Sequence, residues 1–141
     1  MSVTDIQRIG DLELFADCKR AELRKIQPLT TLVRVPKDHV LMREGGAPKQ
    51  FIVLGGGTAR LTRQTEDGVT TVADIGSGEF IGESALLSGT RLDTTATAAT
   101  DLTVFVSSAS EFRSILRIAP SVAQKVRRSS DRRSAVTGQA A

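Results

Sequence analysis

Glycine, acidic and hydroxyl side chains gather in residues 78–91 in an arrangement suited to binding an anion. The segment reads Gly-Glu-Phe-Ile-Gly-Glu-Ser-Ala-Leu-Leu-Ser-Gly-Thr-Arg. This pattern predicts a strand that stops at Gly82 and a single helical turn over residues 84–87. Glycine lets the backbone approach a bound group closely, and the amides at a helix N-terminus attract negative charge. We therefore expect Gly82, Ser84 and Ala85 to border an anion site.

Glu83 and Arg91 carry the charges of this segment. A carboxylate repels a phosphate, but it accepts hydrogen bonds from hydroxyl groups, and a ribose attached to the phosphate would supply one. Glu83 alternatively caps backbone amides within the turn itself. Arg91 lies just beyond the turn, where a guanidinium group can neutralise a phosphate. Together these residues predict a site for a ribose linked to a phosphate.

Short runs of Val, Ile, Thr and Phe fill residues 31–107. Gly, Pro and Asp interrupt these runs at intervals of roughly ten residues, which is typical of an all-β domain. Many short strands at even spacing favour a roll or barrel. The predicted strands are Thr31–Val35, His39–Met42, Gln50–Leu54, Thr58–Arg63, Val69–Ile75, Thr94–Ala98 and Leu102–Ser107.

A helical pattern precedes the β region. Asp17 is a suitable N-cap, and Leu23 and Ile26 recur at a spacing of three residues. Because proline cannot continue a helix, we expect this one to end just before Pro28.

A second helical pattern follows the β region. Ser108 and Glu111 are spaced as a capping box, which predicts a helix start. This helix should end near Ala119, and Pro120 suits the first turn of another helix.

These patterns predict a mainly β fold with flanking helices, namely a double-stranded β-helix, or jelly-roll-like β-roll. We expect one domain over residues 1–141, with N-terminal helices in 1–30, the β-roll in 31–107, C-terminal helices in 108–131 and a frayed tail in 132–141. A short helix lies inside the roll.

The chain resembles the cyclic nucleotide-binding domain family, which includes the catabolite activator protein, protein kinase regulatory subunits and cyclic nucleotide-gated channels. The similarity extends from about Leu12 to Pro120, and the block from Gly78 to Glu83 is its most specific part. In that family the helical turn is the phosphate-binding cassette. The resemblance implies that Gly82, Glu83, Ser84 and Ala85 line a nucleotide pocket, with Glu83 on the ribose 2′-hydroxyl. The implied ligand is cAMP in preference to cGMP.

The cassette departs from the family pattern at its arginine. The family reads Gly-x-Pro-Arg-x-Ala-[Thr/Ser], whereas residues 89–95 read Gly-Thr-Arg-Leu-Asp-Thr-Thr, so that Leu92 takes the place of the arginine. A shift of one residue matters because successive side chains of an extended segment point to opposite sides.

Two interpretations of this departure stay open. In the first, a local bulge returns Arg91 to the pocket and a cyclic nucleotide binds, with Thr94 or Thr95 near its phosphate or purine. In the second, the cassette is degenerate, no cyclic nucleotide binds and the roll acts as a protein-docking module.

Composition restricts the other functions. The chain shows no nucleophile paired with a base and no nucleotide-hydrolysis motif, so we do not expect an enzyme. One His and one Cys make a metal site improbable and exclude an internal disulfide, which favours the cytoplasm. No apolar run reaches the ~18 residues of a membrane span.

Basic residues concentrate at the C-terminal end, where residues 125–133 hold five Lys and Arg against one Asp. This cluster is either a solvated helix end or a contact for an acidic partner or nucleic acid. We do not expect sequence-specific DNA binding, because no helix-turn-helix follows the roll. The expected function is ligand sensing, with a signal passed through the C-terminal helix to a separate effector protein; a homodimer is left open.

Overall fold

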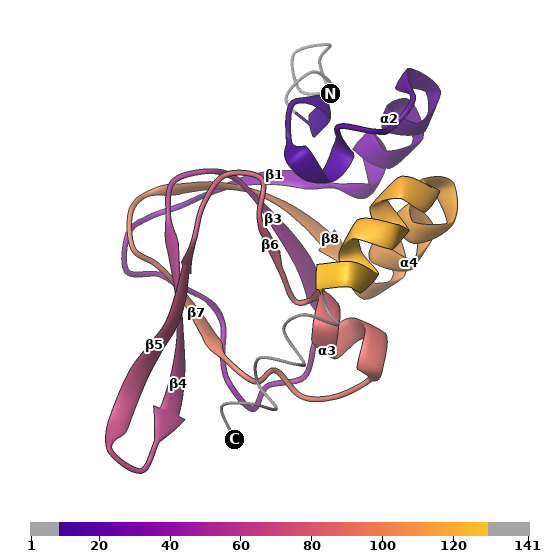
Figure 1. Cartoon of the computed structure of the whole chain (residues 1–141). Helices are drawn as coiled ribbons and strands as arrows, with labels where there is room; N and C mark the ends of the chain where they lie inside the picture. Colours follow the sequence, from indigo (N-terminus) through magenta and orange to yellow (C-terminus); the bar gives the residue numbers. More distant parts are fainter. Residues whose placement is uncertain (1–8, 130–141) are drawn as a thin grey trace.

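Eight strands form two antiparallel sheets in the computed structural model, which describes residues 9–129 (Figure 1). The strand order is β1-β8-β3-β6 in the first sheet and β2-β7-β4-β5 in the second. The mainly β roll with flanking helices is confirmed. The strands are β1 (Thr31–Val35), β2 (Val40–Met42), β3 (Gln50–Gly56), β4 (Ala59–Thr65), β5 (Gly68–Ile75), β6 (Phe80–Ile81), β7 (Thr95–Ala98) and β8 (Leu102–Ser108).

Helices precede, interrupt and follow the strands. They are η1 (Glu13–Phe15), α2 (Arg20–Ile26), η2 (Gln27–Leu29), α3 (Glu83–Ser88) and α4 (Ala109–Ile118). Residues 120–129 form a further helix, called the C-terminal helix below. The predicted frayed tail at 132–141 lies outside the described residues.

Strand β3 is buried on both faces, which explains its unbroken apolar run. Phe51 and Val53 pack in a core shared with the helices, whereas Ile52 and Leu54 pack in a core between the two sheets. Side chains of a strand alternate between its faces, so four consecutive apolar residues are needed where both faces are covered. β3 therefore joins the helical layer to the roll.

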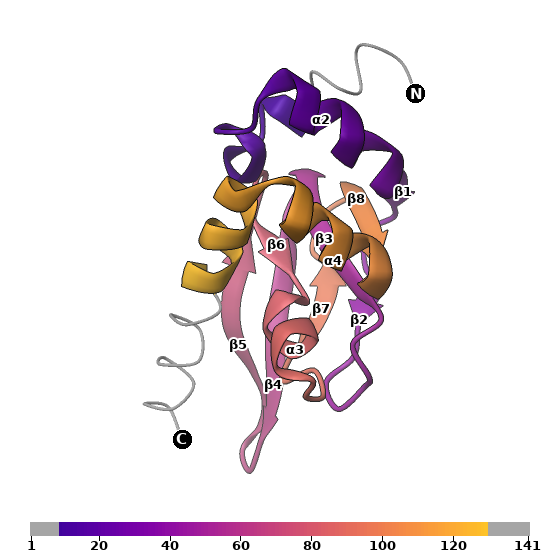
Figure 2. The same cartoon turned by 90° about the vertical axis from the view of Figure 1, so that its right-hand side faces the viewer.

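The helices α2, α4 and the C-terminal helix cover the outer face of the first sheet (Figure 2). Their apolar side chains meet the aromatic residues of β3. Phe112 of α4 lies against Phe51 with ring centroids 4.5 Å apart, and Val122 of the C-terminal helix is fully buried in the same core. The helical layer is thus anchored by packing on one strand.

The helix boundaries confirm most of the capping predictions and correct one. α2 ends at Ile26, before Pro28, as expected. Its N-cap, however, is Lys19 and not Asp17, because the Lys19 amide donates to the Glu22 carboxylate at 2.7 Å while the Asp17 carboxylate contacts Lys125.

The seven strands predicted with bounds hold to within two residues at every boundary, and the strand expected to stop at Gly82, for which the sequence indicated no start, is β6. A strand of two residues is too short for alternation to be visible in the sequence. It forms because Phe80 and Ile81 pair with Val53 and Ile52 of β3. β6 delivers the chain to the predicted anion site.

The capping box predicted at the start of α4 is present. The Glu111 amide donates to the Ser108 hydroxyl at 3.1 Å, and the Ser108 amide donates to the Glu111 carboxylate at 2.9 Å.

We expect Ser108→Ala to lower the free energy of unfolding by about 1 kcal/mol, because one helix amide loses its acceptor. Urea denaturation of this variant beside Ser110→Ala, an exposed residue of the same helix, checks the expectation. Equal stabilities of the two variants would contradict it.

Candidate ligand-binding site

Gly82 fixes the start of the cassette helix α3. Its φ is +95°, a left-handed conformation that glycine adopts most easily. A Cβ atom there would lie 2.5 Å from the Gln50 carbonyl oxygen and 2.8 Å from Met42 Cε. The backbone of the cassette therefore approaches β3 too closely for any other residue, and Gly82 has a structural role in addition to its place beside the cavity.

A cavity of about 850 Å³ opens beside this helix. Pockets of 300–1,000 Å³ are typical of small-molecule sites. Its walls come from β4 and β5, the turn before β6, the first turn of α3 and the segment leading into β7; η1 and the C-terminal helix border it as well. The lining residues used below are Glu13, Leu61, Arg63, Ala73, Asp74, Gly82, Ser84, Ala85, Leu92, Asp93, Thr94, Lys125 and Arg128.

Four predicted site residues line this cavity and three do not. Gly82, Ser84, Ala85 and Thr94 lie on its wall. The remaining three are Glu83, Arg91 and Thr95. Glu83 is fully buried between Gly82 and Ser84 of the wall and is not a lining residue of the cavity.

Arg91 does not reach the cavity, and no bulge returns it there. The Gly45 amide donates to the Leu92 carbonyl at 2.7 Å, and the Leu92 amide donates to the Gly46 carbonyl at 2.9 Å. These two bonds hold the segment extended, with Leu92 on the cavity wall and Arg91 exposed. The Arg91 guanidinium instead donates to the Gly45 carbonyl at 2.9 Å. The local bulge of the first interpretation is therefore not seen in this structure, and Arg91 stays outside the cavity.

Thr95 supports the same loop from the other side. Its hydroxyl accepts a hydrogen bond from the Glu44 amide at 3.0 Å, and it is not a lining residue. Arg91 and Thr95 together hold residues 43–46 beside the cassette. Their role in the structure is therefore to position a loop.

Arg63 is a cation on the cavity wall that the sequence analysis missed. Its Nε donates to the Asp93 carbonyl at 3.1 Å, and its Nη2 lies 3.7 Å from Asp93 Oδ2. Arg63 belongs to β4, thirty residues from the cassette, and only strand pairing brings the two segments together. Thr62 pairs with Thr95 of β7, which places Arg63 next to the cassette end.

Asp74 places a carboxylate on the same wall, at β5. The Arg60 guanidinium donates to it at 2.9 Å and holds the pKa of Asp74 below its ordinary value. The carboxylate therefore stays ionised at neutral pH. Its charge favours a ligand that keeps its own negative charge away from Asp74.

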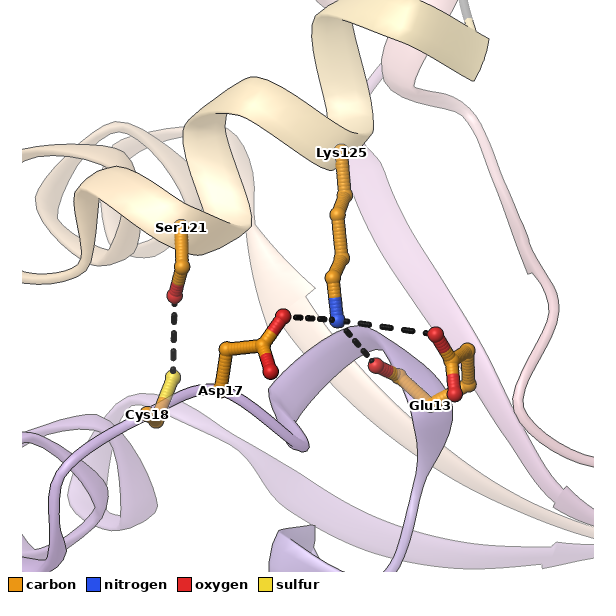
Figure 3. A network of polar contacts seen from close by, with 5 residues as sticks. All are labelled: Glu13, Asp17, Cys18, Ser121 and Lys125. Atoms are coloured by element: carbon orange, nitrogen blue, oxygen red, sulfur yellow. Dashed lines mark hydrogen bonds and ion pairs between the residues drawn. The ribbon is translucent and has the colours of Figure 1, made fainter.

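Lys125 ties the C-terminal helix to the N-terminal segment at the edge of the cavity (Figure 3). Its Nζ donates to the Glu13 carbonyl at 2.6 Å and lies 3.1 Å from Asp17 Oδ2 and 3.7 Å from Glu13 Oε1. In the sequence, Lys125 belongs to the basic cluster of residues 125–133. Its partners are over a hundred residues away, so spacing alone carried no sign of this contact.

Cys18 is half-buried beside this contact. Its Sγ lies 3.8 Å from the Ser121 hydroxyl of the C-terminal helix (Figure 3). Burial raises the pKa of the Cys18 thiol above its ordinary value, and the Ser121 contact offsets part of that increase. The thiol is consequently less reactive than a free cysteine.

Comparison with known proteins places the chain in a family. A family model described as the cyclic nucleotide-binding domain matches residues 32–118, and the chain belongs to this family. It is 31% identical over 113 residues to the acetyltransferase Pat of Mycolicibacterium smegmatis, which covers 78% of this chain and 33% of that protein. It is 30% identical over 128 residues to a cyclic nucleotide-gated potassium channel of Rhizobium etli, which covers 89% and 34%.

A solved structure gives the same result. A variant of a cAMP-binding acyltransferase from Mycobacterium smegmatis superposes with a TM-score of 0.70 at 25% identity, covering 80% of this chain and 35% of that one. The resemblance read from the cassette is confirmed. The chain spans about a third of the length of these relatives.

Residues 9–129 offer neither a membrane-spanning helix nor a metal-binding cluster. None of the helices described there has the length and apolar content to cross a membrane. The same residues contain no group of three or more His, Cys, Asp or Glu side chains placed to hold a metal ion.

The Lys125 contact should contribute to stability. We expect Lys125→Met to lower the free energy of unfolding by about 1 kcal/mol, because a partly buried ammonium group loses a hydrogen bond and an ion pair. Arg127→Met, an exposed residue of the same helix, is the matched control. Thermal unfolding at low and high salt checks this expectation. A loss of unfolding free energy that is as large at high salt as at low salt would count against the ion pair.

The raised pKa of Cys18 predicts slow alkylation. A raised pKa keeps the thiol protonated to higher pH, so the rate of iodoacetamide labelling should rise at a higher pH than it does in the denatured chain. Ser121→Ala removes the contact that lowers the pKa, so the midpoint of the plot of labelling rate against pH should move to a still higher pH. A midpoint at or below that of the denatured chain would refute the expectation.

Proposed function

We propose that this domain is a non-catalytic cyclic nucleotide sensor that binds cAMP in the cavity beside α3. The observation that carries the proposal is that one cavity is walled by the cassette residues Gly82, Ser84 and Ala85 and also by residues of the C-terminal helix. A ligand in this place touches both the recognition segment and a segment able to report its presence. The cytoplasm, where this nucleotide is available, is the compartment that we propose.

The walls suit the two halves of the ligand. We place the phosphate at the first turn of α3, where backbone amides favour an anion. The purine lies against the side chains of β4 and β5, which include Leu61 and Ala73. Thr94 is within the same wall and supplies a hydroxyl to the phosphate or the purine.

The choice of cAMP is supported by the ligand of a relative and by chemistry. The acyltransferase from Mycobacterium smegmatis, 25% identical to this chain, is a cAMP-binding protein. Guanine carries two polar exocyclic groups that need partners, whereas adenine carries one, and a buried polar group without a partner is costly. The wall of β4 and β5 therefore favours adenine.

The signal passes through the C-terminal helix. Lys125 and Arg128 of this helix border the cavity, and Lys125 contacts the N-terminal segment at Glu13 and Asp17. A ligand that displaces either contact changes the position of the helix relative to the roll. We propose that a separate effector protein reads this change.

A second function is favoured by one observation. Leu92 occupies the wall where the family carries an arginine, and Arg91 is bound to a loop carbonyl. A roll without a phosphate cation loses one charge-assisted contact, and such a roll can serve as a protein-docking module that binds no nucleotide.

Calorimetric titration with cAMP and cGMP separates these functions. We expect micromolar or tighter binding of cAMP, and weaker binding of cGMP. Ala73→Trp fills the cavity and should abolish binding, whereas Thr71→Trp introduces the same side chain at an exposed position of β5 outside the cavity. If the unmodified protein gives no heat of binding up to millimolar nucleotide, the sensor function is rejected and the docking module is the function that is left. Equal binding by the two variants would show that the ligand lies elsewhere.

A further inference from the structure

Arg63 is held at the cavity wall by Asp93. Its side chain is 24% exposed, and its guanidinium contacts the carbonyl and the carboxylate of that residue. The 3.7 Å separation between Nη2 and Oδ2 is longer than a hydrogen bond, so the carboxylate does not fully engage the guanidinium. A phosphate oxygen within hydrogen-bond distance of Nη2 would form a charge-assisted bond that is stronger than this 3.7 Å contact.

The backbone around Arg63 is fixed by two neighbouring strands. Arg63 pairs with Thr70 of β5, and the preceding residue Thr62 pairs with Thr95 of β7. Asp93 and Thr94 lie two and one residues before Thr95 and border the cavity. The pairing of β4 with β5 and β7 therefore positions the Arg63 guanidinium beside the end of the cassette, although β4 lies outside the cassette.

The other cations of the cavity are less suited to this role. Lys125 is already engaged with Glu13 and Asp17, and Arg128 is an exposed residue of the C-terminal helix. Arg91 is outside the wall. Among the described residues, Arg63 is thus the arginine that the sheet itself holds at the cavity.

We propose that Arg63 binds the phosphate of the nucleotide in place of the cassette arginine that Leu92 replaces. This inference rests on the proposed function, since it assigns a residue within the same site. Asp93 holds Arg63 through its carbonyl, and its carboxylate yields Nη2 to the phosphate when the ligand enters. The phosphate cation thus comes from β4, and the apolar Leu92 fills the wall.

The test compares cAMP with adenosine, which has the same purine and ribose but no phosphate. Arg63→Gln should weaken cAMP binding by about tenfold to a hundredfold, because a charge-assisted contact is lost. Binding of adenosine should change by less than about twofold to threefold, within the variation of a neutral substitution. Arg34→Gln is the matched control, because it makes the same change at an exposed strand position, in β1, outside the cavity.

A second variant tests whether Arg63 takes the place of the cassette arginine. Leu92→Arg restores the arginine at the family position and should tighten cAMP binding. In that background Arg63→Gln should cost much less than in the unmodified chain, because the two cations then serve one phosphate.

The outcomes separate the two proposals. If the unmodified chain binds cAMP and Arg63→Gln binds it equally well, the role of Arg63 is overturned while the sensor function stands. If Arg63→Gln weakens adenosine as much as cAMP, Arg63 is structural and the inference is again overturned. If cAMP binds only after Leu92→Arg, no cation replaces the family arginine. If neither form binds, the sensor function itself fails.

Discussion

The burial of both faces of β3 is the constraint on which the rest of the structure depends. Phe51 and Val53 face the helices, while Ile52 and Leu54 face the second sheet. A strand in this position cannot shift its register by one residue without exchanging two complete sets of core contacts. β6 pairs with β3 and leads directly into α3. The position of the cassette is therefore set by β3.

The close approach of Gly82 to β3 transmits that constraint to the ligand site. A side chain at this position would collide with the Gln50 carbonyl, so the cassette backbone packs against the sheet without an intervening side chain. The cavity therefore has one wall made by the roll and one wall that rests on side-chain contacts. The latter is the C-terminal helix, whose polar contacts with the rest of the chain include those of Lys125 and Ser121. This difference suits the proposed sensor function, because recognition requires a fixed frame and signalling requires a segment that can move.

The charged residues at the cavity are arranged differently from the family pattern. Leu92 faces the cavity and Arg91 faces away, because the segment is held extended by its bonds to Gly45 and Gly46. Strand pairing nevertheless brings Arg63 to the same wall, next to Asp93. Tertiary structure thus places a cation beside the cassette, where the local sequence carries Leu92 in place of the family's usual arginine.

The sequence by itself determined the elements and the class of site. The short runs of Val, Ile, Thr and Phe, the capping box at Ser108 and Glu111 and the glycines of the cassette are local signals, and local backbone geometry follows from them. The family resemblance also depends on contiguous residues, and it was confirmed. Only the tertiary structure decided which side chains face the cavity. Arg63 and Lys125 lie far along the chain from Asp93 and Glu13, and sequence spacing holds no information about contacts that form when distant segments pack on a shared core.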